Sequence, residues 1–312
     1  MMVRSLLALT IVPPRSARLI VVSALVAGCE LPPSSVATPD EVVPPLDASA
    51  RRGQFRADPA NQPGDEAYLC YSFDVDGISD VHVGRVVWHP PDGPVFLHHA
   101  SLFAAAGLPD VGEIPCDPMP TRVAALGVYT PGIEPLQLPD GVGIELPAGT
   151  RRLLVQAHTM RHAAGPAATT YVDLDLAAEP VLHSVNWVDV LAPVPDIFPG
   201  EKTLSVQNCR FDRPTHIVSV WAHMHRIGSE FHGVIVRADG TQQALLDVKP
   251  WDYNHQFIYP VDVQLQPNDI VQTQCYWSNT TSDIVVAGPY STNEMCNQGL
   301  LVWPFDSALC AQ

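Results

Sequence analysis

Short runs that alternate apolar and polar residues are the feature of this sequence that most restricts its fold. Tyr68–Val75, Tyr171–Leu176 and Asp269–Trp277 are examples. Side chains of a β-strand point alternately to its two faces, so such runs indicate strands with one buried face. The 312 residues include 31 prolines spread along the chain, and long runs with a helical period are missing. We therefore expect an all-β protein of short strands joined by turns, as in sandwiches and barrels.

The chain is long enough for two domains, each with its own core. Its composition changes at Ala177-Ala178-Glu179-Pro180, and the pattern of short strands and turns begins again after these residues. We therefore predict two tandem antiparallel β-sandwich domains, residues 56–178 and residues 179–312.

The first residues have the composition of an export signal. Three arginines precede the apolar run Leu19–Gly28, which is followed by Cys29. This run is too short to span a bilayer but suits the core of a signal peptide. We expect residues 1–28 to be removed, so that the mature protein works outside the cytoplasm.

The residues around Cys29 indicate how the mature protein is attached to a membrane. Val26-Ala27-Gly28-Cys29 resembles a bacterial lipoprotein cleavage box, in which the cysteine becomes the lipidated N-terminus. A plain secretory signal with an incidental cysteine is the alternative. Residues 29–55 are rich in proline and lack periodicity, so we interpret them as a tether. The expected location is the periplasm or the cell surface, with the lipid anchored in a membrane.

The charge of the chain excludes one class of partner. Loss of residues 1–28 would remove three of the 17 basic residues and none of the 33 acidic ones, which takes the net charge from −16 to −19. Nucleic-acid binding needs basic side chains to neutralise phosphates. We therefore expect no nucleic-acid partner.

Six cysteines remain when Cys29 is set aside. An even number of cysteines in an exported chain indicates disulfides. Two lie in the first half and four in the second, so that each half could be stapled independently. Spacing alone leaves 15 pairings open. The six are Cys70, Cys116, Cys209, Cys275, Cys296 and Cys310.

Five of the 12 histidines lie within apolar strand patterns, in groupings that can chelate a metal. If Val218–His225 is a strand, His223 and His225 project from the same face as an imidazole pair. His98 and His99 are adjacent, so they can share one ion only at a bulge or a strand end. His158 would supply a third nitrogen from another strand. Such a set of three imidazoles suits zinc or copper. It is compatible with hydration, hydrolysis or electron transfer as the function of the site.

Met295 lies in the polar segment Ser291–Asn297, where a methionine has little reason to pack. A thioether is a soft ligand, and with two imidazoles it selects copper over zinc or calcium. On this view Met295 completes a site with His223 and His225.

Four motifs in this order resemble the copper type II ascorbate-dependent monooxygenases. They are His98-His99, Gln156-x-His158, His223-x-His225 and Glu294-Met295-Cys296-Asn297. The resemblance covers the chain from about Cys70 to Cys310. It implies two jelly-roll-like domains with one copper each, and the hydroxylation of an activated C–H bond by O2. Ascorbate or a similar one-electron donor would be the co-substrate, and a small molecule the substrate.

The resemblance also assigns residues. His98, His99 and His158 match the copper site that stores and delivers an electron. His223, His225 and Met295 match the copper site that binds O2 and carries out catalysis. The family also implies the disulfides Cys70–Cys116, Cys209–Cys310 and Cys275–Cys296.

The sequence departs from the peptide-hydroxylating members of the family at two positions. Those members have an arginine two residues before the His-x-His pair and a tyrosine after Met-Cys-Asn, where this chain has Trp221 and Gly299. Asn297 is retained and Gln156 also matches the family. The candidate substrate-binding residues are Trp221, Asn297 and Gln156. The exchange predicts a more apolar or aromatic substrate than a peptide C-terminus.

Two other functions compete with a monooxygenase. A periplasmic lipoprotein could hold copper without turnover, and a β-sandwich adhesin could carry these histidines incidentally. A binding protein needs only one site, so two unlike sites favour catalysis.

Overall fold

The structure is a computed structural model, and it describes residues 45–47, 49–57, 64–78, 81–90, 95–104, 108, 111–114, 116, 124–130, 132–161, 168–305 and 308–310. The predicted signal peptide, Cys29 and most of the predicted tether lie outside these residues. In the described part of the chain, no helix is long and apolar enough to cross a membrane.

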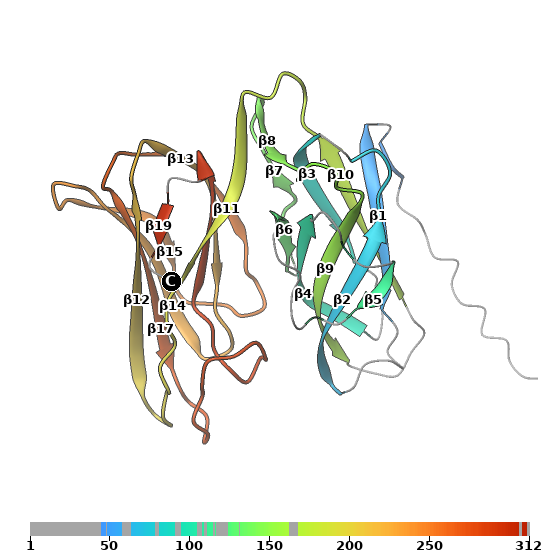
Figure 1. Ribbon diagram of the computed structural model, residues 1–312. Coiled ribbons are helices and arrows are strands. Elements are labelled where there is room, and N and C mark those ends of the chain that lie inside the picture. Colours follow the sequence, from blue (N-terminus) through green and yellow to red (C-terminus); the bar gives the residue numbers. More distant parts are fainter. Residues whose placement is uncertain are drawn as a thin grey trace, which may run out of the picture. The chain divides into compact units, whose positions relative to one another are not determined.

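The described elements form three β-sheets (Figure 1). The largest sheet has the strand order β1-β10-β3-β8-β11-β18-β13-β16, with β7 paired to β3. Its strands are β1 (Ala50–Ala57), β3 (His82–His89), β7 (Leu136–Gln137), β8 (Val142–Glu145), β10 (Ala168–Leu176), β11 (His183–Leu191), β13 (Thr215–His223), β16 (Ile258–Leu265) and β18 (Asn297–Trp303).

The two smaller sheets belong to different parts of the chain. One has the order β5-β2-β9-β4-β6 and the other the order β15-β14-β17-β12-β19. The first contains β2 (Glu66–Asp74), β4 (Val95–Ala104), β5 (Gly112–Ile114), β6 (Ala124–Tyr129) and β9 (Arg152–Arg161). The second contains β12 (Lys202–Phe211), β14 (Gly228–Val236), β15 (Gln242–Val248), β17 (Ile270–Ser278) and β19 (Ala308–Cys310).

The predicted fold class is confirmed: the protein is an all-β, sandwich-like structure. Strand β17 shows the reason, because its residues alternate strictly between buried and partly buried positions. The proline- and glycine-rich passage between Cys116 and Pro147 contains the short strands β6, β7 and β8. Neighbouring strands complete the hydrogen bonds of these short segments, a long-range effect that local composition does not reveal.

Two predicted boundaries need correction. Residues 50–55 were assigned to the tether but belong to β1, which pairs with β10. Phe55 is buried there, and the Arg52 guanidinium contacts the Asp173 carboxylate at 2.6 Å. Strand β13 ends at His223, so His225 lies just beyond it instead of within it.

The largest sheet continues across the predicted domain boundary at residues 178 and 179. Val142–Ile144 of β8 pair in parallel with His183–Val185 of β11, and the other ladders of this sheet are antiparallel. The division into domains at this point therefore stays a prediction.

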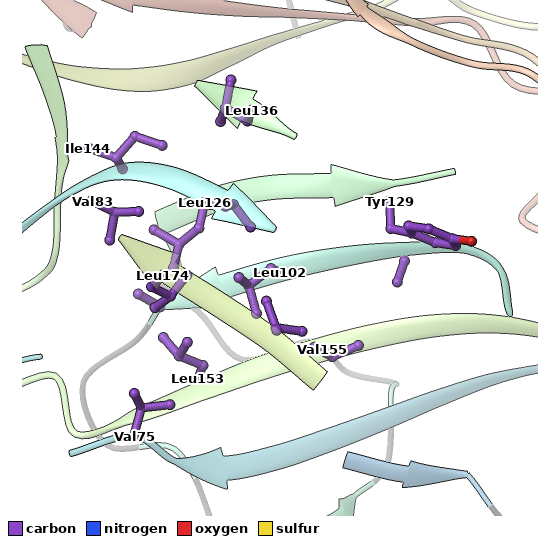
Figure 2. Close-up of a cluster of buried hydrophobic side chains, with 14 of the residues drawn as sticks. Val75, Val83, Leu102, Leu126, Tyr129, Leu136, Ile144, Leu153, Val155 and Leu174 are labelled. Atoms are coloured by element: carbon purple, nitrogen blue, oxygen red, sulfur yellow. The ribbon is translucent and has the colours of Figure 1, made fainter. Parts of the chain in front are cut away.

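Buried hydrophobic side chains form two main clusters in the described residues. In the first, side chains from β3, β4, β9 and β10 point toward one another, among them Val83, Leu102, Val155 and Leu174 (Figure 2). The second is centred on β12, β13, β14, β17 and β18 and includes Phe231 and Trp277. These clusters fix the strands from which the histidine groups project.

The three disulfides implied by the family resemblance are present. Cys70 bonds Cys116, Cys209 bonds Cys310, and Cys275 bonds Cys296. Among these bonds, Cys275–Cys296 joins β17 to the residue that follows Met295.

Candidate metal centres and the cavity between their ligands

The first histidine group is assembled by neighbouring strands β4 and β9. Their register shifts between Leu97 and His99, so the expected bulge is present. His99 then lies opposite His158, and the rings of His98 and His99 turn to the same region. The Nδ1 atom of His99 lies 3.0 Å from Nδ1 of His98 and 3.2 Å from Nδ1 of His158.

These three nitrogens have the spacing of ligands around one ion. Metal–nitrogen bonds of about 2.0 Å at a tetrahedral centre hold ligand nitrogens roughly 3.3 Å apart. Burial keeps the rings neutral: it lowers the pKa of His98 to about 4 and places that of His99 well below its usual value. Desolvation also lowers the pKa of His158, although the Glu66 carboxylate opposes it. Neutral imidazole is the form that binds metals, so the group fits a copper ion.

Glu66 orients the third histidine of this group from β2. Its carboxylate lies 2.6 Å from Nε2 of His158, which directs Nδ1 of that ring toward His99. The Tyr68 ring stacks on the His158 ring with centroids 4.5 Å apart. The Glu66 carboxylate also accepts hydrogen bonds from the backbone N–H and the hydroxyl of Ser291, at 2.7 and 2.8 Å. Glu66 therefore links the first histidine group to the segment that carries Met295.

The second histidine pair lies at the end of β13. Nδ1 of His223 lies 2.7 Å from Oε1 of Gln256, and Nδ1 of His225 lies 3.1 Å from the carbonyl oxygen of Asn293. Both partners are acceptors, so Nδ1 of each ring carries the proton and Nε2 keeps its lone pair. Nε2 of His225 is buried without a hydrogen-bond partner among the described residues. Two lone pairs of this kind fit a metal ion.

Desolvation also keeps this second pair neutral. It lowers the pKa of His223 to about 3 and that of His225 to about 4. The two ring centroids are 5.0 Å apart, with the ring planes nearly perpendicular. The His223 centroid is 5.4 Å from that of His99, which places the two histidine groups next to each other.

Glu294 holds the methionine segment against the His-x-His motif. The side chain of Glu294 is completely buried, and its Oε2 atom accepts hydrogen bonds from the backbone N–H groups of His225 and Met295 at 2.9 and 3.3 Å. Oε2 also accepts a bond from the Trp277 indole, and Oε1 accepts one from the backbone of Ile227, both at 2.9 Å. Burial raises the pKa of Glu294 to about 7 against these four hydrogen bonds.

One cavity joins the two sets of candidate ligands. It has a volume of about 750 Å³, and His99, His223 and Met295 all line it. The three candidate substrate-binding residues, Trp221, Asn297 and Gln156, line the same cavity. The structure therefore brings the predicted site residues together, although their roles stay predictions.

One protein-family profile matches the C-terminal part of the chain. Residues 192–312 match the profile of the copper type II ascorbate-dependent monooxygenase, C-terminal domain. This part of the chain is similar to that domain. It contains His223, His225 and Met295, and the match confirms the resemblance that the motifs indicated. The family is copper and ascorbate dependent.

The other comparisons add no functional information. No curated protein matches the chain. A solved structure of allantoicase is 10% identical over 70% of this chain and 79% of the other, with a TM-score of 0.23. A score this low supports no structural argument.

Several residues of the site were not predicted from sequence. Glu294 stood inside a recognised motif, but its burial depends on the fold. Glu66 lies two residues before Tyr68, and Gln256 follows a turn that showed no strand pattern. Trp187 and Asp189 also line the cavity, from β11. A carboxylate facing a cavity becomes visible only when the neighbouring strands are known.

Proposed function

We propose that this protein is a copper-dependent monooxygenase that hydroxylates an activated C–H bond of a small molecule with O2 and a one-electron donor such as ascorbate. The observation that carries the proposal is that two unlike donor sets border one cavity. One set has three imidazoles, and the other has two imidazoles and a thioether. The family match covers the second set.

The proposed reaction inserts one oxygen atom into a C–H bond. One substrate molecule, one O2, two electrons and two protons yield the hydroxylated product and water, and two donor molecules supply one electron each. Copper, when bound, supplies the one-electron redox chemistry that lets O2 react with a closed-shell substrate. Nδ1 of His98, His99 and His158 would hold one ion, and Nε2 of His223 and His225 with the Met295 sulfur would hold the other.

The chain's own residues prepare both sites before any metal binds. Gln256 and the Asn293 carbonyl fix the ring orientation of His223 and His225, and Glu66 does the same for His158. All donors are neutral, which suits Cu(I). The Trp221 ring stacks on the His223 ring with centroids 5.1 Å apart and shields that side of the ligand from water.

Copper stoichiometry and the ligand set test the proposal directly. Purified protein should bind two coppers per chain, and X-ray absorption of the Cu(I) form should show a sulfur ligand at one of them. Met295→Ile should remove the sulfur signal and ascorbate-dependent O2 consumption, while the three-histidine site keeps its copper.

Other outcomes would change the assignment. Isolation with one zinc and no copper would contradict the monooxygenase. Two coppers without turnover of any amine, phenethyl compound or small peptide would favour a copper-holding protein instead.

We also propose that the protein is exported and lipidated at Cys29, on the strength of the sequence around that residue. Mass spectrometry of the mature N-terminus would test this. A free α-amino group at Cys29 without diacylglycerol would remove the anchor and leave the copper chemistry unaffected.

A further inference from the structure

A segment from the second half of the chain contacts His98 of the first histidine group. The Tyr253 ring stacks on the His98 ring with centroids 4.3 Å apart and an interplanar angle of 24°. The Asn254 side chain forms a hydrogen bond with the same imidazole. None of these three residues lines the cavity of about 750 Å³. Tyr253 and Asn254 therefore reach the first histidine group from outside that cavity.

An exposed guanidinium group lies over the Tyr253 ring. The central carbon of the Arg226 guanidinium is 5.6 Å from the ring centroid, which is a cation–π contact. No acidic side chain forms an ion pair with Arg226 in the described part of the chain. Burial lowers the pKa of His98 and that of His158, and the charge of Arg226 lowers both further. A positive charge at the surface therefore acts on the first histidine group.

The charge of Arg226 is opposite to the charge of the protein as a whole. The chain has 33 acidic and 17 basic residues, a formal net charge of −16, so most of its surface repels anions. A local charge of the other sign can attract a small ion to one point of such a surface. The nearby Glu66 carboxylate is already bonded to His158 and Ser291. Arg226 is therefore a point of attraction for an anion next to the first histidine group.

Tyr253 connects this guanidinium to the imidazole of His98. Burial raises the pKa of the Tyr253 phenol to about 12, although the charge of Arg226 opposes the rise. The phenol is therefore neutral at pH 7 and adds no negative charge that would repel an anion. Its ring contacts both the guanidinium and the His98 ring. An anion bound by Arg226 would therefore be separated from His98 by about one aromatic ring.

We infer that Arg226, Tyr253 and Asn254 form a docking site for the electron donor, a small anionic enediol such as ascorbate. The guanidinium would pair with the enediolate, and the exposed Asn254 amide would form a hydrogen bond with a hydroxyl group of the donor. The inference rests on the proposed function and adds the place where its electron donor binds. Because these residues do not line the cavity, donor and substrate could be bound at the same time.

Each docking event would transfer one electron. The ascorbate monoanion gives up one electron and one proton and becomes the ascorbyl radical anion, and the proton passes to the solvent. The electron reduces the Cu(II) ion that His98, His99 and His158 would hold to Cu(I). Two donor molecules in succession therefore supply the two electrons that the proposed hydroxylation consumes.

Binding of ascorbate to the metal-free protein tests the docking site without depending on copper. In an NMR titration under nitrogen at pH 7, ascorbate should shift the resonances of the Arg226 guanidinium and the Tyr253 ring. Arg226→Gln should weaken this binding about fivefold, the size of effect expected for an exposed ion pair. Arg226→Lys keeps the positive charge and should weaken the binding less.

Arg151→Gln is the matched control for this titration. Arg151 is also exposed, and it forms no ion pair with an acidic side chain in the described part of the chain. This variant should bind ascorbate with the wild-type affinity. Equal affinities of the wild-type protein and Arg226→Gln, or resonance shifts confined to residues away from Arg226 and Tyr253, would overturn the docking site.

Anaerobic reduction of the copper-loaded protein provides a second measurement. The loss of the Cu(II) EPR signal is followed with ascorbate and with hydroquinone, a neutral donor. Arg226→Gln should slow reduction by ascorbate about fivefold and change reduction by hydroquinone by no more than about twofold, because only the anion loses an ion pair. Equal slowing with both donors would mean that the substitution alters the copper site itself, which would overturn the inference.

A second exposed aromatic side chain provides the competing route for electrons. Tyr290 is 50% exposed and its ring contacts that of Tyr68, which stacks on His158. Both tyrosines line the cavity, unlike Arg226. If Tyr290→Leu slows reduction by ascorbate and Arg226→Gln does not, electrons enter by way of Tyr290 and the docking site at Arg226 is wrong.

These results separate the docking site from the proposed function. Ascorbate binding that depends on Arg226 in the metal-free protein supports the docking site even if the copper-loaded protein hydroxylates no compound, and that second result would count against the monooxygenase alone. If the protein hydroxylates a substrate with ascorbate while Arg226→Gln binds ascorbate and is reduced by it as the wild-type protein is, the docking site fails and the proposed function stands.

Discussion

The carboxylate of Glu294 accepts a hydrogen bond from the backbone N–H of His225 at 2.9 Å. The residue that precedes Met295 is thereby tied to the second histidine of the His-x-His motif. Because His225 lies beyond the end of β13, strand hydrogen bonds do not fix its position. Glu294 takes over that function for both His225 and Met295.

We therefore expect Glu294→Gln to weaken the second copper site selectively. The NH2 group of a glutamine would replace one of the carboxylate oxygens that now accept hydrogen bonds from N–H groups. At least one buried N–H group would then have no acceptor. Copper affinity at this site should fall about 10–100-fold, the usual effect of losing a residue that positions ligands. Copper titration of the Cu(I) form with a competing chelator measures this.

Two controls accompany that measurement. The three-histidine site should keep its affinity, and Glu134→Gln, at an exposed position, should leave both sites unchanged. If Glu294→Gln binds two coppers with wild-type affinity, Glu294 does not position the ligands.

The Glu66 carboxylate should act in the same way on the first site. Glu66→Gln weakens the acceptor for Nε2 of His158, so copper affinity of the three-histidine site should fall about 10–100-fold. Ser291→Ala removes a second contact of Glu66 but leaves its bond to His158. It should therefore keep the first copper, and equal losses in both variants would show that general destabilisation is responsible.

Two disulfides should differ in their effects on stability and on copper binding. Replacing Cys275 and Cys296 with alanine opens a loop with a sequence separation of 21, and replacing Cys209 and Cys310 opens one of 101. Chain entropy predicts a loss of about 3 kcal/mol of unfolding free energy for the first pair and about 4–5 kcal/mol for the second. Only the first pair adjoins Met295.

The variant that loses less stability should therefore be the one that loses copper. The Cys275/Cys296 double variant should lose copper from the second site, whereas the Cys209/Cys310 variant should retain two coppers although it unfolds at lower denaturant concentration. Denaturant unfolding and metal analysis of the folded proteins measure the two effects. Equal retention of copper would mean that the Met295 segment holds its position without Cys275–Cys296.

Local pattern predicted much of this structure because strand alternation is a local property. The strands that carry His158, His223 and Cys275 could be located in this way, and the adjacency of His98 and His99 required the bulge that the structure contains. The partners of each strand could not be predicted, because pairing joins residues far apart in the sequence. Asp189 and Trp221 lie on the same face of the sheet because β18 pairs with both of their strands. Their proximity could therefore not be predicted from the sequence.

Metal-free protein should lose stability as the solution becomes acidic, because His98, His223 and His225 are buried and neutral. Burial lowers the pKa of these histidines in the folded state to about 4, about 3 and about 4. In the unfolded chain they take up protons below about pH 6.5. The unfolded state then binds more protons, so the free energy of unfolding falls as the pH falls.

Between pH 6.5 and pH 5 each of these histidines should cost up to about 2 kcal/mol of unfolding free energy. Glu294 acts in the opposite direction: its pKa of about 7 in the folded state means that the folded protein takes up a proton first as the pH falls, which stabilises it. Comparison with His223→Gln/His225→Gln isolates the histidine contribution. Denaturant unfolding of both metal-free proteins from pH 7 to pH 5 should give a shallower pH dependence for the double variant, since two of the five histidines with a lowered pKa are gone. Identical slopes would mean that these imidazoles become protonated in the folded protein as readily as in the unfolded chain, contrary to their burial.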